Sequence, residues 1–474
     1  MKRRSFIQSV ITLTGGLIAA SRLPAHSTES KGKTLKGRVI NGSNGVQGVV
    51  ISDGYNVVQT DKNGKYEFEP HPDARAVFIS TPAGYAFKNQ NGIARHYRPL
   101  KEISLKKSLV FNLVPLDKDD NEHQFIIWAD PQVKNDNDVQ KMMNESVPDV
   151  QKFVAAAGAG TLLHGITVGD IVWDEPKLFP EYDKAVEKMG IPFFQCLGNH
   201  DMDLNKGGDE TSDVTFQQNY GPTYYSFNRG QVHYIVMDNV RYLGKDKEYD
   251  GYFVQNQLDW LQKDLAFVSK DKLVILCVHI PVHDGTKNAE MLYPILKDRN
   301  VHIMSGHTHY NKNTIKQGIY EHNHGTVCGA WWTGPICEDG TPNGYGIYKV
   351  KGVELQWYYQ TTGQNADHQL KTFVNDFDNN NKQMQVNIWN YDPAWKTEYF
   401  VDGASKGELE QFEGLDPLAY STMLGPDLPK PRGFAEPRKT RHMFKAIIPG
   451  TSKSVTVKTT DRFGKTYTAT HNIA

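Results

Sequence analysis

The feature that most limits how this chain can fold is a series of short apolar runs in residues 122–307, each of which stops at a polar side chain. Segments with apolar residues three and four positions apart separate the runs, most clearly at 139–158 and 254–268, and this spacing predicts helices. Buried strands that alternate with helices predict an α/β domain whose sheets are covered on both faces. The runs read "QFIIWAD", "GITVGD", "PFFQCLGN", "VHYIVMD", "LVILCVHI" and "VHIMSGH".

The side chains that end these runs are of the kinds that bind metal ions. Because the carboxyl ends of strands in α/β sheets share an edge, residues that are far apart in sequence can meet there. Imidazoles suit Zn and Fe, and carboxylates bind harder cations, so we expect two divalent or mixed-valence metal ions, of Mn, Zn or Fe. A carboxylate such as Asp170 can bridge two ions about 3.5–4 Å apart. The strand-end residues are Asp130, Asp170, Asn199, His279, His307 and His309.

These residues also carry a resemblance. The pattern D-x-[H/Q]…GD…GNHD…H…GHTH, spread over residues 122–350, resembles the calcineurin-like metallophosphoesterase superfamily, in its bacterial branch with N-terminal and C-terminal accessory domains. The resemblance implies an α/β fold with a central two-layered β-sheet core flanked by helices (αββα) and β-sandwich-like domains before and after it. It also implies a division of the ligands: Asp130 and His309 for one metal ion, Asp170 as the bridge, and Asn199, His279 and His307 for the other.

Two positions depart from the pattern of this family. Gln132 stands where histidine is usual, and its amide oxygen is a neutral and weaker metal ligand than imidazole, so whether Gln132 binds a metal ion stays open. In "GDIVWDE", Trp173 occupies a position where an acid is common, and the acid follows at Asp174, to which we assign no role.

The resemblance further implies catalytic roles for two residues of "GNHD". His200 would protonate the leaving-group oxygen and Asp201 would orient His200, while a hydroxide that bridges the metal ions attacks phosphorus. We therefore predict a dimetal-dependent phosphoesterase that hydrolyses a phosphomonoester or phosphodiester. The alternative is a non-catalytic surface or ligand-binding protein that retains the phosphoesterase fold, suggested by Gln132 and by the β-rich flanking regions.

Bulk composition restricts the partners. The chain has 474 residues, a formal net charge of -1 and a sequence pI of about 7.0, so it lacks the basic excess of proteins that bind nucleic acids. We expect a small phosphorylated substrate and no nucleic acid. The identity of the substrate and the oligomeric state stay open, because loops set the specificity of such folds.

The flanks of the α/β region have a β-strand pattern. Residues 34–117 contain short alternating runs with turn sequences between them, which predicts an N-terminal β-sandwich. Its run "GVVISDGYNVVQTDKNGKYEF" resembles carboxypeptidase-regulatory-like modules. We place the phosphoesterase domain at 122–355 and a C-terminal β-rich accessory domain at 356–474.

Residues 1–30 have the plan of an export signal. A basic start is followed by a short apolar run from Val10 to Ala20 and then by small residues, and the run is too short for a stable membrane span. Arg3 and Arg4 resemble the twin-arginine type of signal. We expect a periplasmic or secreted protein; an ordinary N-terminal helix with two chance arginines is the alternative.

Several other residues invite a functional interpretation that we do not favour. We interpret His322 and His324 of "EHNHG" as loop residues, His283 as a surface residue and Asp238 as a turn former. Trp331 and Trp332 are expected in the core, with a stacking wall for substrate as the alternative.

The four cysteines divide into two pairs by context. Cys328 and Cys337 could form a disulfide in an oxidising compartment, whereas Cys196 and Cys277 lie within apolar runs and are expected to be buried strand residues.

Overall fold

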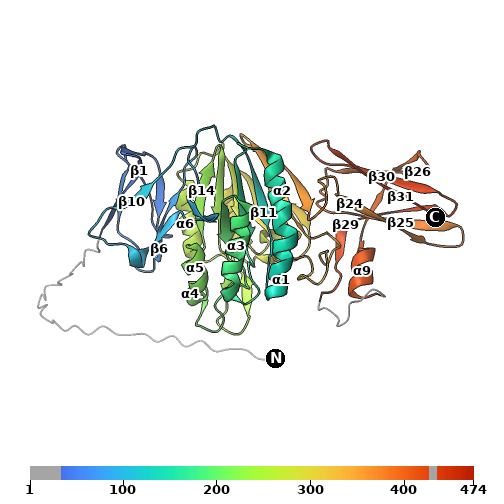
Figure 1. Ribbon diagram of the computed structural model, residues 1–474, viewed down its shortest axis with the longest axis horizontal. Helices are drawn as coiled ribbons and strands as arrows, with labels where there is room; N and C mark the ends of the chain where they lie inside the picture. The colour runs from blue at the N-terminus through green and yellow to red at the C-terminus, as the bar shows by residue number, and fades with distance from the viewer. Residues whose placement is uncertain (1–33, 426–434, 474) are drawn as a thin grey trace, which may run out of the picture.

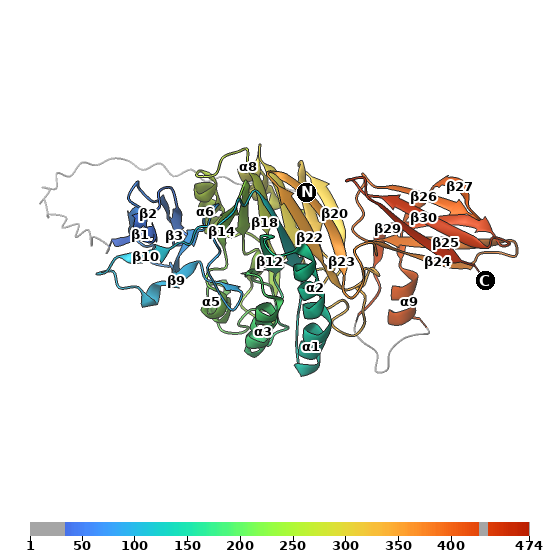
Figure 2. The same ribbon diagram turned by 45° about the horizontal axis from the view of Figure 1, so that its top comes forward.

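The computed structural model describes residues 34–425 and 435–473 and has three parts in a row (Figure 1). The N-terminal β-domain lies at one end, the α/β domain in the middle and the C-terminal β-domain at the other end; Figure 2 shows the same order from a second direction. The proposed export signal at 1–30 lies outside the described residues. Within the described residues, no helix combines the length and the apolar character needed to cross a membrane.

The N-terminal part is a small sandwich of two sheets, as its alternating pattern predicts. Val39 and Phe111 of one sheet pack against Ile51 and Val77 of the other. One sheet contains β1 (Leu35–Asn41), β2 (Asn44–Gly45), β5 (Lys65–Phe68) and β10 (Leu109–Asn112). The other contains β3 (Val50–Ser52), β4 (Val57–Gln59), β6 (Ala76–Ser80) and β9 (Tyr97–Pro99).

The middle part is built on two facing sheets. The first sheet has the order β23 (Glu354–Thr361), β22 (Gly344–Lys351), β11 (Glu122–Trp128), β12 (Leu163–Val168), β13 (Phe193–Cys196), β8 (Ile93–Ala94) and β7 (Asn89–Gln90). The second has the order β14 (Tyr225–Arg229), β15 (Val232–Val236), β18 (Leu273–Cys277), β19 (Asn300–Ser305), β21 (Ile319–Asn323) and β20 (Lys312–Lys316). Two short strands of the segment before residue 117 thus extend the first sheet, and β23 continues it past residue 355.

Each sheet of the middle part is covered by helices on its outer face. Along β11, Phe125 and Ile127 point into the core between the sheets, while Ile126 and Trp128 pack with the helical layer, which is the two-residue alternation of a strand buried on both faces. The helices over the first sheet are α1 (Asp136–Lys141), α2 (Val147–Ala157) and α3 (Phe179–Met189). Those over the second are α6 (Gln255–Leu265) and α8 (Ala289–Leu296). The predicted αββα fold is confirmed.

The helix predicted at 139–158 is one helical run with an irregular middle. Asn135 caps its start, because its side chain accepts hydrogen bonds from the backbone N–H groups of Asn137 and Asp138. Between α1 and α2 lies a π-helical turn (Met142–Ser146). Pro148 follows in the first turn of α2, and its missing N–H removes one bond from the regular ladder at this point.

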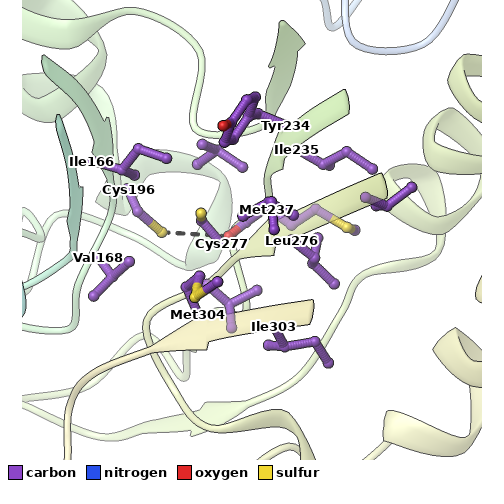
Figure 3. Packing of buried hydrophobic residues seen from close by; sticks show 14 of the residues in the cluster. Ile166, Val168, Cys196, Tyr234, Ile235, Met237, Leu276, Cys277, Ile303 and Met304 are labelled. Atoms are coloured by element: carbon purple, nitrogen blue, oxygen red, sulfur yellow. Dashed lines mark hydrogen bonds between the residues drawn. The ribbon is translucent and has the colours of Figure 1, made fainter. Parts of the chain in front are cut away.

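The core between the sheets is apolar and contains two of the cysteines. Figure 3 shows Ile166 and Val168 of β12 opposite Ile235 and Leu276 of the second sheet. The buried Cys196 thiol faces the carbonyl oxygen of Met237 at 3.5 Å. All four cysteines of the chain lie in the described residues and are free thiols, so Cys328 and Cys337 are not joined.

The C-terminal part is a second sandwich that contacts the middle part through polar groups. The Asp392 carboxylate accepts hydrogen bonds from Tyr320 at 3.1 Å and from Arg462 at 2.8 Å. One sheet contains β24 (Leu370–Asp376), β25 (Asn381–Ile388), β29 (Lys439–Pro449) and β28 (Glu410–Leu415). The other contains β27 (Ala404–Glu408), β26 (Lys396–Val401), β30 (Ser454–Thr460) and β31 (Thr466–Asn472). The helix α9 (Pro417–Met423) follows β28.

The remaining short elements are one turn that follows β9 in the N-terminal part, and turns, short helices and a hairpin of the middle part. They are η1 (Leu100–Glu102), η3 (Pro176–Leu178), α4 (Asp209–Ser212), α5 (Val214–Tyr220), β16 (Val240–Tyr242), β17 (Tyr249–Gly251) and α7 (Val282–Gly285).

Candidate metal centre

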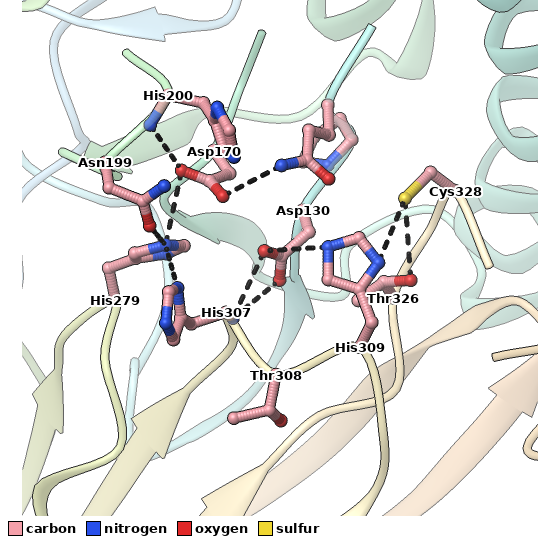
Figure 4. A network of polar contacts seen from close by, with 12 residues as sticks. Asp130, Asp170, Asn199, His200, His279, His307, Thr308, His309, Thr326 and Cys328 are labelled. Atoms are coloured by element: carbon pink, nitrogen blue, oxygen red, sulfur yellow. Dashed lines mark hydrogen bonds and ion pairs between the residues drawn. The ribbon is translucent and has the colours of Figure 1, made fainter. Parts of the chain in front are cut away.

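The side chains that were predicted as metal ligands lie together at the carboxyl ends of the strands (Figure 4). The first sheet contributes the residues that follow β11, β12 and β13, and the second sheet contributes those that follow β18 and β19. Seven residues form this group, which we call the metal centre: Asp130, Gln132, Asp170, Asn199, His279, His307 and His309.

The backbone at the metal centre is held in a conformation that side chains with a Cβ rarely adopt. Such residues cost on the order of 1–3 kcal/mol each and gather at functional sites, where the surrounding fold maintains them. A neighbouring glycine is required as well, since a Cβ at Gly306 would lie 2.5 Å from Oδ2 of Asp130. The residues with positive φ are Asp130 (50°), Gln132 (44°), Asp170 (49°), His307 (73°) and His309 (53°).

One half of the metal centre is arranged around His279. Its Nε2 lies 3.0 Å from Oδ1 of Asn199, 3.2 Å from Oδ1 of Asp170 and 3.1 Å from Nδ1 of His307. Its Nδ1 donates to the carbonyl oxygen of Val168 at 2.8 Å, and since a carbonyl only accepts, Nε2 is the nitrogen that can bind a metal ion. Ligand atoms of Asp170, His279 and His307 lie within 4.8 Å of one another.

The other half is arranged around Asp130. Its carboxylate accepts hydrogen bonds from the backbone N–H of His307 at 2.9 and 3.1 Å, and its Oδ1 lies 3.6 Å from Nε2 of His309. Nδ1 of His309 donates to the carbonyl oxygen of Gly329 at 3.1 Å, which again leaves Nε2 free to bind. Gln132 donates from Nε2 to Oδ2 of Asp170 at 3.0 Å, while its buried Oε1 has no hydrogen-bond partner among the described residues.

The electrostatics of the metal centre favour added positive charge. Burial, together with the nearby Asp170 carboxylate, raises the pKa of Asp130 to about 8. Burial opposes a charge on His279, but Asp170 and Asp130 outweigh it and raise the pKa of His279 to about 9. Burial lowers the pKa of His309 to about 4, which keeps this imidazole in the neutral form that binds metals.

These donors fit two cations. Two buried carboxylates, Asp130 and Asp170, already favour the charged form of the nearby His279, and the orphaned amide oxygen of Gln132 is an acceptor whose isolation costs about 1–3 kcal/mol. Bound cations would neutralise the carboxylates, and the amide oxygen of Gln132 would coordinate one of these cations. The fit includes Gln132, whose role the sequence left open.

The orientation of His200 differs from what the sequence predicted. The carboxylate oxygens of Asp201 accept from the backbone N–H groups of Val172 at 3.0 Å and Gly198 at 2.9 Å, so Asp201 holds the loop together. The carboxylate that forms a hydrogen bond with the imidazole is that of Asp174, whose Oδ1 lies 2.8 Å from Nδ1 of His200. The expectation that Asp201 orients His200 is therefore corrected.

Aromatic side chains surround the metal centre, and only part of this was visible in the sequence. Trp331 stacks on His309 with ring centroids 4.3 Å apart, and Trp173 meets His200 edge-on at 5.7 Å. Trp332 is buried and donates to the carbonyl oxygen of Pro131 at 2.9 Å, which agrees with its expected core position. Tyr249 meets the ring of His307 at 5.8 Å, and no feature of the sequence pointed to it.

The interpretations of His322 and His283 were wrong, whereas His324 does lie in a loop. His322 belongs to β21 and His324 follows that strand, and both are buried; Nε2 of His324 faces the Tyr348 hydroxyl at 2.7 Å. His283 is also buried, and its ring nitrogens face the Tyr293 hydroxyl at 2.9 Å and the carbonyl oxygen of Ile319 at 3.1 Å. These two hydrogen bonds compensate the burial of His283, which was expected at the surface. Asp238 does form a local turn, because its Oδ1 accepts from the backbone N–H of Val240 at 3.0 Å.

Comparison with known families assigns the chain to a class. Three family models match consecutive stretches: the N-terminal domain of calcineurin-like phosphoesterases at residues 33–116, the calcineurin-like phosphoesterase domain at 110–311, and the C-terminal domain of these proteins at 321–467. The chain belongs to the calcineurin-like phosphoesterase family, in the branch with N-terminal and C-terminal accessory domains.

Individual relatives are more distant. A protein of Psychrobacter arcticus described as "Probable cyclic nucleotide phosphodiesterase" is 28% identical over 179 residues, which are 34% of this chain and 62% of that protein. A dimetal phosphatase from Danio rerio is 15% identical and covers 50% of this chain and 98% of its own length, with a TM-score of 0.34. The purple acid phosphatase PPD1 of yellow lupin is 12% identical, with coverages of 72% and 67% and a TM-score of 0.37. At these TM-scores neither structure supports a closer assignment.

Proposed function

We propose that the chain is an exported, dimetal-dependent phosphoesterase that hydrolyses a phosphomonoester or phosphodiester. The observation that carries this proposal is the metal centre, where oxygen and nitrogen ligands from five strand ends surround two buried carboxylates. Asp130, Gln132 and His309 would hold one cation. Asn199, His279 and His307 would hold the other, and Asp170 lies between the two groups. When bound, such cations neutralise phosphoryl oxygens and lower the pKa of a water molecule between them.

The residues of the chain supply the proton for the leaving group. The Nδ1 atom of His200 is engaged by Asp174, so Nε2 is the atom that would deliver a proton to the departing oxygen. The backbone N–H of His200 donates to Oδ1 of Asp170 at 2.9 Å, which fixes the imidazole beside the metal centre without using it as a ligand. Lys247 forms an ion pair with Asp174, and despite burial His200 and Lys247 together lower the pKa of that carboxyl group.

The description of the Psychrobacter protein is consistent with this chemistry. Its name specifies a cyclic phosphodiester as substrate, and cyclic diesters fall within the class proposed here. The match spans 62% of that protein, so its substrate is only a candidate for this chain.

The decisive experiment measures metal content and turnover together. We expect about two ions per purified chain and hydrolysis of p-nitrophenyl phosphate or bis(p-nitrophenyl) phosphate when Mn, Zn, Fe and Mg are supplied in turn. Asn199→Ala and His307→Ala should each lose metal and activity, whereas His471→Ala, in β31 of the C-terminal domain, should lose neither. A chain that binds metal but turns over no phosphate ester would support the non-catalytic alternative.

Export rests on residues 1–30 and has its own test. The basic start with Arg3 and Arg4, followed by a short apolar run, motivates a periplasmic or secreted location. In a bacterial host we expect the full-length chain outside the cytoplasm with its first residues removed. The double variant Arg3→Lys, Arg4→Lys should accumulate uncleaved in the cytoplasm; equal export of both chains would exclude the twin-arginine route.

A further inference from the structure

A pocket opens beside the metal centre, next to His307. Its volume is about 260 Å³. It lies between β17 of the β16–β17 hairpin and the second sheet, and Figure 4 shows His307 beside His279, with Asp170 between this pair and His200. With about 30 Å³ as the share of one water molecule in the liquid, this space suits a group of pentose or glycerol size. The lining residues that matter here are Tyr249, Ile280, Lys287, Tyr310, Thr314 and Glu321.

The pocket is not the place of the leaving group. A leaving group must depart toward the proton donor, and His200 contacts Asp174 and Trp173. Neither of these two residues lines the pocket, and neither does His200. The pocket is therefore available to a different substituent on phosphorus. A phosphomonoester has no second organic substituent, whereas a phosphodiester has one that stays attached after hydrolysis.

The charges in the pocket wall are paired. The Lys287 ammonium lies 2.9 Å from Oδ2 of Asp250, and Arg241 donates to both oxygens of the same carboxylate. The buried Glu321 carboxylate accepts from the backbone N–H groups of Val282 at 2.6 Å and His283 at 2.8 Å. A second anionic group would find no unpaired cation among these residues. The wall thus suits an uncharged polar ligand.

One hydroxyl at the pocket is poised to bind substrate. Tyr249 is half-buried, its ring meets His307 edge-on, and its hydroxyl makes no hydrogen bond with the described residues. A phenol O–H placed between the metal centre and the pocket can donate to an oxygen of the substrate.

We propose that this pocket binds the retained alcohol of a phosphodiester, and that the preferred substrate is a diester whose retained group is an uncharged polyol of about pentose size. This inference rests on the proposed function. Water adds its oxygen to phosphorus, the bond from phosphorus to the leaving oxygen breaks, and that oxygen takes a proton. The products are the leaving alcohol and the phosphomonoester of the polyol, which remains in the pocket until release.

The test compares three substrates with the same p-nitrophenol leaving group: p-nitrophenyl phosphate, methyl p-nitrophenyl phosphate, and the p-nitrophenyl ester of thymidine 5′-phosphate. Only the retained group differs among them. With the metal-loaded full chain we expect kcat/KM for the thymidine ester to exceed that for the methyl ester at least tenfold. Equal values for the two diesters, or turnover of the monoester alone, would overturn the inference while leaving the proposed function intact. If none of the three substrates is hydrolysed, both the inference and the proposed function are contradicted.

A variant that fills the pocket tests the proposal more directly. Thr314 pairs with Glu321 across β20 and β21 and points into the pocket, whereas its neighbour Ile315 points to the other face and is 54% exposed. Thr314→Phe should lower kcat/KM for the thymidine ester at least tenfold and leave the methyl ester and the monoester within twofold. The matched change Ile315→Phe should affect no substrate. A uniform loss on all three substrates, or no loss on any, contradicts the proposal.

Removal of the hydroxyl tests Tyr249 separately. A neutral hydrogen bond is worth about 0.5–1.5 kcal/mol, so Tyr249→Phe should raise KM for the thymidine ester roughly two- to tenfold with kcat within twofold. A fall in kcat at unchanged KM would show that the hydroxyl acts on the reacting groups in the transition state and not on the retained alcohol, and would remove Tyr249 from the proposal.

Discussion

Two buried polar residues six positions apart, at and just after strand β12, have different surroundings. His164 lies near the start of the strand, and Asp170 lies just beyond its end. Asp170 lies at the metal centre, where His279, Gln132 and the backbone of His200 all approach its oxygens. His164 lies in the core between the sheets, fully buried, and neither of its ring nitrogens has a hydrogen-bond partner among the described residues. Its neighbours there are aromatic rings, among them Phe125 and Tyr234.

This difference shows how one domain accommodates buried polar groups in two ways. In the interior, burial lowers the pKa of His164 well below its ordinary value, so the ring stays neutral and packs as an aromatic group. At the strand ends, the polar groups are arranged around space that a cation can take, and nearby charges hold the pKa of Asp170 below its usual range despite burial. Burial of a histidine or carboxylate therefore does not by itself indicate a site; convergence of ligand atoms does.

The largest effect should come from the bridging position. Asp170→Asn keeps the shape of the side chain but removes the charge that both halves of the metal centre share. We expect loss of metal and a fall in kcat/KM of more than about a hundredfold, beyond the 10–100-fold that changes behind the ligands produce. The control Asp376→Asn removes a carboxylate that is 85% exposed and should leave both quantities unchanged. Retained metal with full activity in Asp170→Asn would contradict the assignment.

A smaller effect should follow from the residue behind the proton donor. Burial opposes a charge on His200, but Asp170 and Asp174 outweigh it and raise its pKa. Asp174→Asn should therefore lower this pKa, so that the acid form of His200 is lost at a lower pH and the alkaline limb of the kcat/KM profile moves to lower pH. We expect a tenfold or greater fall in activity at pH 8, within the range of about 10²–10⁴ that a general acid contributes, with metal content retained. An unshifted pH profile would mean that Asp174 does not act through His200.

The sequence predicted the ligands of the metal centre but not their supports. Apolar runs that end on Asp, Asn and His mark the tips of strands, and their order along the chain matches a family, so Asp130 and His307 could be found without coordinates. The partner of His200 could not, because Asp174 is displaced by one position from the usual acid and reaches the ring only through a backbone with positive φ (57°). Adjacency in sequence suggested Asp201, whose carboxylate is instead taken by two backbone N–H groups.

The sequence also predicted the parts of the fold that depend on local patterns, but not those that depend on pairing between distant segments. Period-two alternation predicted the sandwiches, and the three-and-four spacing predicted α2 and α6, because local burial sets these patterns. No local pattern could place β7 and β8 on the edge of the middle sheet, since β8 joins it by pairing Ile93 with Phe193, a hundred positions away, and β7 pairs only with β8. The buried His322 and His283 were misjudged for a similar reason: their partners, His302 and Tyr293, come from other elements.

The smallest effect should appear in stability rather than activity. The unfolded chain protonates His164 near its ordinary pKa of 6.5, whereas the folded chain holds the ring neutral until far lower pH. Keeping His164 neutral costs no free energy of unfolding above pH 6.5. Below pH 6.5 the cost grows as the pH falls, to about 2 kcal/mol at pH 5, because one pH unit corresponds to about 1.36 kcal/mol. His164→Phe should therefore unfold at a higher urea concentration than the parent chain at pH 5. The difference between the two urea midpoints should be smaller at pH 8. Its kcat/KM at pH 8 should stay within twofold, since the ring lies in the aromatic core and away from the metal centre. A gap that is equal at both pH values would show that the change acts by packing alone and that the buried imidazole imposes no acid penalty.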